Sequence, residues 1–200
     1  DLSAMSRAVS KKTAMVIVEP IMGEAGVITP EDGYLAGLRE ICDRVGALLV
    51  FDCVQTGIGR TGQWFGFEHE GVRPDVITLA KGIGGGLPLG ATIAYGKAAH
   101  LLQPGDHGST YSGTALATSA VSAVISEMKR IDATSLANKQ GARLREGLLK
   151  LSLVDHVRGS GLLLGAQLTE GVATAEVVPA LLAAGLIVNG VNASTIRFAP

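Results

Sequence analysis

Cysteine is scarce in this sequence. It occurs twice in 200 residues, as Cys42 inside a helical pattern and as Cys53 at the end of a strand pattern. The two residues form no CxxC motif and no Cys/His cluster, so we expect neither a disulfide framework nor a bound metal. A reducing, cytoplasmic location is the corresponding expectation.

An excess of charge of one sign and a long apolar run are also missing. Lysine and arginine number 17 against 18 acidic residues, giving a formal net charge of −1. Such a balance favours neither nucleic acid nor an anionic membrane as a partner. No apolar run reaches the roughly 18 residues that a membrane-spanning helix needs.

Glycine and apolar residues are abundant instead. Glycine accounts for 27 residues, and apolar residues make up 47% of the chain against 18% charged. This balance is typical of an α/β protein in which helices cover a parallel sheet and tight loops connect the elements. The final "TIRFAP" ends abruptly in an apolar run, so we expect a segment of a longer polypeptide.

Short apolar runs rich in β-branched residues predict the strands of the first part of the chain. Residues 14–19, 47–52, 75–80 and 91–96 are apolar on both faces and predict four buried parallel strands. Residues 31–45 have apolar side chains at helical spacing and are followed by Gly46, which predicts a helix and a βαβ unit.

The pattern changes near residue 130. Helices are expected over residues 114–131 and 135–151, then a glycine-interrupted strand in "HVRGSGLLLGAQL", a helix over 173–184, and short strands in "LIVN" and "TIRFA". We therefore divide the chain into residues 1–130, part of a large α/β domain, and residues 131–200, the start of a small α+β domain.

Ionisable side chains follow three of the predicted strands. Glu19, Asp52 and Lys81 stand at strand ends, where ligands gather in open α/β sheets. Taken singly, Asp52 also fits a helix cap or a turn, Lys81 fits a solvated surface lysine, and the glycines at 82–86 fit ordinary turns. Together, a lysine able to form a Schiff base and a nearby carboxylate fit a pyridoxal phosphate site. The glycines would let a planar cofactor approach the backbone.

Five ordered motifs carry a family resemblance: "VEPIMGEAGVITP", "FDCVQTGIGRTG", "PDVITLAKGIGGGLPLGA", "HGSTYSG" and "IRFAP". In order and spacing they resemble the class III pyridoxal-phosphate-dependent aminotransferases, most closely the acetylornithine aminotransferases. The resemblance covers nearly the whole chain. It implies the fold-type I transferase fold and a homodimer with shared active sites.

The resemblance also implies roles for individual residues. Lys81 would form the Schiff base with pyridoxal 5'-phosphate and move a proton during transamination, and Asp52 would pair with the pyridine nitrogen. Gln55 would hydrogen-bond the phenolic oxygen of the cofactor. Thr110, with Ser109 beside it, would reach the phosphate of the cofactor bound by the other subunit, and Ser109 would also contact substrate.

Two further residues would bind substrate. Arg197 would hold a substrate carboxylate through its planar fork. Glu24 would pair with Arg197 when the amino donor presents a terminal amine, and would release it when glutamate or 2-oxoglutarate enters. Outside the resemblance, Arg197 also fits an edge-strand surface arginine and Glu24 a solvated loop carboxylate, while Glu19 fits a role in loop geometry.

The implied reaction transfers the terminal amino group of N-acetylornithine to 2-oxoglutarate in arginine biosynthesis. This gives N-acetylglutamate 5-semialdehyde and glutamate. Ornithine, succinylornithine and 4-aminobutyrate aminotransferases are alternatives that share these motifs. A catalytically inactive α/β binding module and a cofactor-free Schiff-base lyase are alternatives of other classes. Cys53 stands where the family usually has glutamate, and residues 112–114 also depart from the usual pattern.

Overall fold

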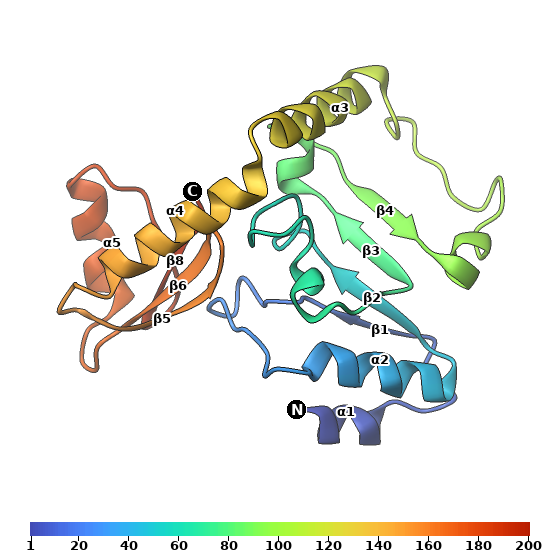
Figure 1. Ribbon diagram of the computed structural model, residues 1–200, viewed down its shortest axis with the longest axis horizontal. Helices are drawn as coiled ribbons and strands as arrows, with labels where there is room; N and C mark the ends of the chain where they lie inside the picture. The colour runs from blue at the N-terminus through green and yellow to red at the C-terminus, as the bar shows by residue number, and fades with distance from the viewer.

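The computed structural model describes residues 1–200 as two four-stranded β-sheets with helices packed on them (Figure 1). The first sheet has the order β1-β2-β3-β4 and contains β1 (Met15–Val18), β2 (Leu48–Asp52), β3 (Val76–Leu79) and β4 (Ala91–Ala94). The second has the order β5-β6-β8-β7 and contains β5 (Val154–Ser160), β6 (Leu163–Leu168), β7 (Asn189–Asn192) and β8 (Thr195–Phe198).

Five α-helices and three short 3-10 helices complete the chain. The α-helices are α1 (Leu2–Ala8), α2 (Tyr34–Val45), α3 (Ala115–Arg130), α4 (Ala133–Leu148) and α5 (Thr174–Ala183). The 3-10 helices are η1 (Gly66–Glu70), η2 (Lys81–Gly84) and η3 (Gly96–His100). None of the helices combines the length and the apolar character needed to cross a membrane.

The main core lies between α2 and one face of the first sheet. Leu38 and Ile41 of α2 are buried in the same cluster as Phe51 of β2 and Ile77 of β3. The helix ends where predicted, at Gly46, whose backbone is left-handed and whose N–H donates to the Cys42 carbonyl. It begins at Tyr34, three residues later than expected, because Gly33 before it has a φ of 81°.

The prediction of four parallel strands is wrong for β4. The pairs β1–β2 and β2–β3 are parallel, whereas β4 runs antiparallel to β3, with Ile77 opposite Ile93. A parallel return needs a crossover of about a dozen residues or more, usually through a helix. The segment between β3 and β4 holds only the short η2 turn, so the chain folds straight back.

The prediction that these strands are buried on both faces is also wrong at the sheet edges. Three consecutive residues of β2 are buried, whereas β4 has no buried residue. In β1, Met15 and Ile17 are 54% and 59% exposed. These side chains lie on the opposite face to Val16, which belongs to the core cluster under α2.

The second sheet differs from its prediction in two places. The glycine-interrupted strand is an antiparallel hairpin, β5 and β6, in which Ser160 pairs with Leu163 and Gly161 takes a positive φ in the turn. Only Asn189 of the run "LIVN" belongs to β7; Leu186, Ile187 and Val188 precede the strand, and Ile187 is 87% exposed. The apolar run therefore indicated the region of β7 but not the limits of the strand.

The parts of the chain that form the two sheets are connected at Ile131–Asp132. Helix α3 packs on η2 of the first part, and α4 packs on β5 and β6 of the second sheet. Asp132 between them has a left-handed backbone, with a φ of 49°. We propose this link as the boundary between a large domain and a small one, in keeping with the division expected near residue 130.

Replacement of Gly141 by alanine is expected to destabilise the protein by about 1 to 3 kcal/mol. Gly141 lies on the face of α4 that meets the β5–β6 turn, and a Cβ there would stand 1.9 Å from the Gly161 carbonyl oxygen. Because this neighbour is backbone, the helix must move away. Urea unfolding of both proteins measures the change in free energy.

Gly147 provides the matched control in the same helix. A Cβ at Gly147 meets no atom within 4 Å. Replacement of Gly147 by alanine is therefore expected to raise the free energy of unfolding by up to about 1 kcal/mol through helix propensity. Equal effects of the two substitutions would contradict the close approach at Gly141.

Candidate active site

Lys81 stands immediately beyond the carboxyl end of β3. It is the first residue of η2, it is exposed, and its backbone is left-handed with a φ of 51°. A residue other than glycine rarely adopts this conformation, and such strain concentrates at functional sites. The structure thus presents the lysine at a sheet edge, exposed to solvent.

The turn that carries Lys81 rests on α3. Gly85 and Gly86 both take positive φ values, and a Cβ on Gly85 would stand 2.7 Å from a methyl group of Val124 in α3. Glycine is therefore needed at position 85 both for backbone conformation and for close packing. The glycine-rich run after Lys81 holds the turn against a helix as well as leaving room beside the lysine.

Asp52 ends β2, the strand next to β3, and is half-buried. Its Oδ1 accepts a hydrogen bond from the Val54 N–H at 3.0 Å, while Oδ2 has no partner within the chain. Asp52 lies opposite Thr78 in the parallel register, three residues before Lys81. The carboxylate and the amine therefore emerge at the same edge of the sheet, which is the usual ligand position in this type of fold.

Arg197, Glu24 and Gln55 meet although they are far apart in sequence. Arg197 Nη1 donates to Glu24 Oε1 at 2.7 Å and to Gln55 Oε1 at 3.1 Å, and Gln55 Nε2 donates to Glu24 Oε1 at 3.1 Å. The Arg197 side chain is only 12% exposed, whereas that of Glu24 is 66% exposed. A largely buried guanidinium is thus covered by a carboxylate that can swing into solvent.

The charge environment keeps Glu24 ionised. The hydrogen bond from Arg197 holds the pKa of the Glu24 carboxyl below its usual range, and the positive charges of Arg197 and Lys81 act in the same direction. Gln55, which is hydrogen-bonded to both members of the pair, follows Asp52 by three residues, so the pair and the strand end that carries Asp52 belong to one site.

The loop that carries Glu24 is shaped by short-range contacts. Glu19 accepts a hydrogen bond from the Gly23 N–H at 3.0 Å, which agrees with a role of Glu19 in loop geometry. A Cβ on Gly23 would stand 2.5 Å from Gln55 Oε1. A side chain at position 23 would therefore displace the Gln55 amide from the place where it accepts from Arg197, a role of Gly23 that no sequence motif indicated.

Ser109 and Thr110 are not brought to this cluster within the chain. Both are exposed in the loop between η3 and α3, and neither side chain forms a hydrogen bond. In Figure 1 this loop extends away from the first sheet on the side of β4. Within this chain neither hydroxyl group contacts Lys81 or the Arg197 cluster.

Cys53 is buried in this structure. The residue is 1% exposed, and burial raises the pKa of its thiol to about 12. A thiol with a raised pKa carries little thiolate, which is the nucleophilic form. Cys42 is buried as well, and both cysteines are free thiols.

The whole chain, residues 1–200, matches a family model described as aminotransferase class III. This chain belongs to the class-III aminotransferase family. The match includes the two strand ends that carry Asp52 and Lys81 and the strand that carries Arg197.

Curated relatives in this family share about half of the residues of the chain. The acetylornithine aminotransferase of Streptomyces coelicolor is 51% identical over 203 residues, covering 100% of this chain and 50% of the relative. That of Mycobacterium tuberculosis H37Rv is 50% identical over 207 residues, with the same coverages. The chain therefore spans about half the length of the curated relatives it matches.

Solved aminotransferase structures match the whole chain as well. The ornithine aminotransferase of Toxoplasma gondii has a TM-score of 0.93 at 31% identity and covers 100% of this chain and 49% of that one. A second structure of the same enzyme is described with partial occupancy of PLP at its active site. The N-acetylornithine aminotransferase of Stenotrophomonas maltophilia has a TM-score of 0.90 at 32% identity, covering 100% and 54% of the two chains.

Proposed function

We propose that the chain is the lysine-bearing part of a pyridoxal-phosphate-dependent aminotransferase. The observation that carries the proposal is that Lys81 and Asp52 emerge at one sheet edge, with Gln55, three residues after Asp52, hydrogen-bonded to the Arg197–Glu24 pair. We further propose N-acetylornithine as amino donor and 2-oxoglutarate as acceptor, in arginine biosynthesis. The identity of about 50% to acetylornithine aminotransferases supports this choice.

The residues present fit pyridoxal 5'-phosphate. Asp52 Oδ2 has no partner in the chain and is free to accept a hydrogen bond from a protonated pyridine nitrogen. Lys81 presents an exposed amine at the same edge, suited to hold the cofactor through Nζ. Gln55 lies between this edge and Arg197, so the expected contact with the phenolic oxygen would share its amide with the arginine pair.

When bound, the cofactor supplies an electron sink for the carbon that loses its proton. Lys81 Nζ would take this proton and return it, as a general base and then a general acid. Asp52 would keep the pyridine nitrogen protonated through Oδ2. Arg197 would bind the carboxylate of glutamate or 2-oxoglutarate after Glu24 turns away, and would remain paired with Glu24 when the donor has no carboxylate there.

We also propose a homodimer in the cytoplasm. Ser109 and Thr110 are exposed on their loop, and apolar residues around them are exposed as well: Leu101, Leu102, Tyr111 and Leu116. A second copy placed over this loop would cover these residues and bring Thr110 to a phosphate held mainly by the other subunit. The two buried free thiols support a reducing location.

Ornithine aminotransferase is the alternative favoured by a specific observation, since the T. gondii enzyme superposes with a TM-score of 0.93. Its 31% identity is lower than the 51% shared with the S. coelicolor acetylornithine aminotransferase. Succinylornithine and 4-aminobutyrate aminotransferases stay as alternatives without such support. The conjunction of Lys81, Asp52 and a buried Arg197 argues against a binding module or a cofactor-free lyase.

Borohydride reduction of the complete enzyme that contains this chain tests the proposal. Borohydride makes a reversible lysine–pyridoxal linkage permanent, so peptide mass mapping is expected to find a pyridoxyl group on the peptide that contains Lys81. Transamination of N-acetylornithine, ornithine, succinylornithine and 4-aminobutyrate with 2-oxoglutarate then ranks the donors. A folded, complete enzyme without the pyridoxyl group would overturn the proposal in favour of a binding module.

A further inference from the structure

One face of the second sheet supports the loop of residues 23–28, which carries Glu24. Arg158 of β5, Gly165 of β6 and Arg197 of β8 are partners in consecutive strand pairs, so they form one row across the sheet. Arg197 donates to Glu24 Oε1, and Arg158 Nε donates to the Gly26 carbonyl at 2.8 Å. Two arginines of one row therefore hold the same loop at neighbouring points.

The one residue between the two arginines in this row is Gly165, and the loop passes directly over it. A Cβ on Gly165 would stand 3.0 Å from the Gly26 carbonyl oxygen and 2.9 Å from the Val27 Cβ. Gly26 itself has a φ of 121°, and a Cβ there would stand 3.1 Å from Arg158 Nη2. The backbone of the 23–28 loop thus lies directly on the sheet, beside the Arg158 guanidinium.

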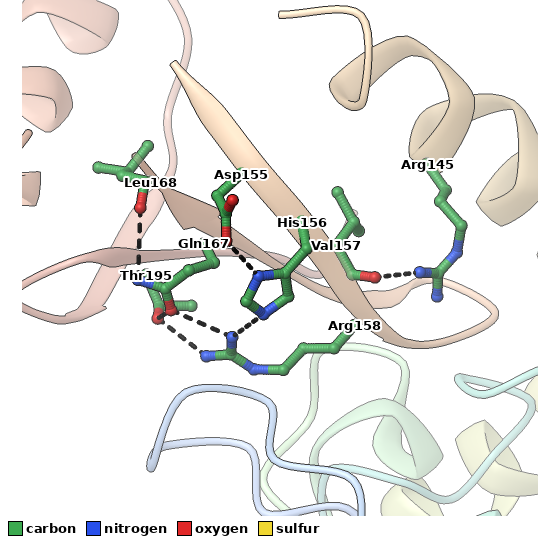
Figure 2. A network of polar contacts seen from close by, with 8 residues as sticks. All are labelled: Arg145, Asp155, His156, Val157, Arg158, Gln167, Leu168 and Thr195. Carbon is green, nitrogen blue, oxygen red and sulfur yellow. Dashed lines mark hydrogen bonds and ion pairs between the residues drawn. The ribbon is translucent and has the colours of Figure 1, made fainter. Parts of the chain in front are cut away.

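The rest of the Arg158 guanidinium is fixed by side chains of its own sheet. Nη1 donates to Gln167 Oε1 at 3.1 Å, and Nη2 donates to Thr195 Oγ1 at 2.9 Å. Nη1 also lies 3.2 Å from His156 Nε2, which must accept because arginine only donates. Figure 2 shows the guanidinium directed at Gln167 and Thr195, with His156 beside it.

None of these acceptors is a carboxylate. Arg158 forms no ion pair, and burial lowers the pKa of its guanidinium. Its contribution to the loop is therefore the fixed geometry of several donors and not an attraction between charges. A lysine at position 158 would keep the positive charge and most of the aliphatic side chain, but not the planar arrangement of several N–H donors.

We propose that Arg158 is a positioning residue for the substrate switch, which is the Glu24–Arg197 pair that opens when glutamate or 2-oxoglutarate enters. Arg158 fixes the 23–28 loop on the second sheet so that Glu24 reaches Arg197. The inference rests on the proposed function and deepens it. Thr195 and Arg197 are two residues apart on β8 and point to the same face, so Arg158 and the switch arginine are anchored to the same strand. Without Arg158, the loop would lose its hydrogen bond at Gly26 and would be held by the Asn192 Nδ2 bond to the Ala25 carbonyl and by the buried Val27 side chain, while Arg197 keeps its place on β8.

Amide hydrogen exchange of the complete enzyme tests whether Arg158 holds the loop. Peptides covering residues 21–29 are expected to exchange about tenfold faster in Arg158→Met, since a hydrogen bond from a charged donor is lost. Arg158→Lys is expected to exchange at a similarly raised rate, and it guards against misfolding of the methionine variant. Arg145→Met is the matched control, because Arg145 donates to the Val157 and Gly159 carbonyls from α4 and does not contact the loop.

The two half-reactions test whether the loop positions Glu24. In Arg158→Met and Arg158→Lys, the single-turnover rate with the amino donor that presents a terminal amine is expected to fall about tenfold. The reaction with glutamate is expected to stay within about twofold of the parent, because Arg197 remains available. Arg145→Met is expected to leave the ratio of the two half-reactions unchanged.

The outcomes separate the inference from the proposed function. Unchanged exchange in both Arg158 variants, or equal losses in both half-reactions, would overturn the positioning role. Full rescue by Arg158→Lys would overturn it too, since charge alone would then suffice. A parent enzyme that transaminates no donor would refute the proposed function and the link to Glu24, while the exchange rates would still decide whether Arg158 holds the loop.

Discussion

Replacement of Lys81 by alanine is expected to lower the rate of transamination by at least about a thousandfold. The substitution removes both the amine that would hold the cofactor and the group that would move the substrate proton. No other lysine lies at the carboxyl end of β2 or β3, so no neighbouring amine can replace it. Single-turnover kinetics on the complete enzyme measure the loss.

The same substitution is expected to leave folding almost unchanged. Lys81 is exposed, and its side chain forms no hydrogen bond or ion pair within the chain. Thermal unfolding of the variant checks this, and Lys139→Ala in α4 provides an exposed lysine away from the site as a control. Turnover close to the parent rate in a folded Lys81→Ala enzyme would refute the assignment of this lysine.

The strand ends of the site could be predicted because their signal is local. Apolar runs that stop at Asp52 and just before Lys81 reveal both the strands and the polar residues beyond them. Parallel pairing of β2 and β3 then brings the two ends to one edge without further information. The direction of β4 was also within reach, since the short connection from β3 leaves no room for a crossover.

The support of the site could not be predicted in the same way. Arg158 acts through the Gly26 carbonyl, 132 positions away, and this contact depends on the register of three strands. A charged residue inside a strand pattern rich in glycine and leucine was the only local signal. The close approach of Gly23 to Gln55 likewise exists only after the 23–28 loop has met the first sheet.

Replacement of Arg197 by alanine is expected to impair the half-reaction with glutamate by about a hundredfold or more, and the half-reaction with N-acetylornithine much less. Glutamate needs the guanidinium to bind its carboxylate, whereas the acetylated donor would react while Arg197 is covered by Glu24. The expected ratio of losses is the reverse of that for the Arg158 variants. Equal losses in both half-reactions would contradict the switch.

The Glu24–Arg197 pair also makes the stability of the fold depend on pH. Because the folded pKa of Glu24 is lowered, the pair stabilises the fold at full strength above the ordinary carboxyl pKa and loses this contribution as the pH falls through the lowered value.

Glu24→Gln removes that titration and leaves Arg197 less firmly covered. The variant is therefore expected to bind glutamate more tightly than the parent at neutral pH, and a higher KM for glutamate would show that Glu24 does not compete for the arginine.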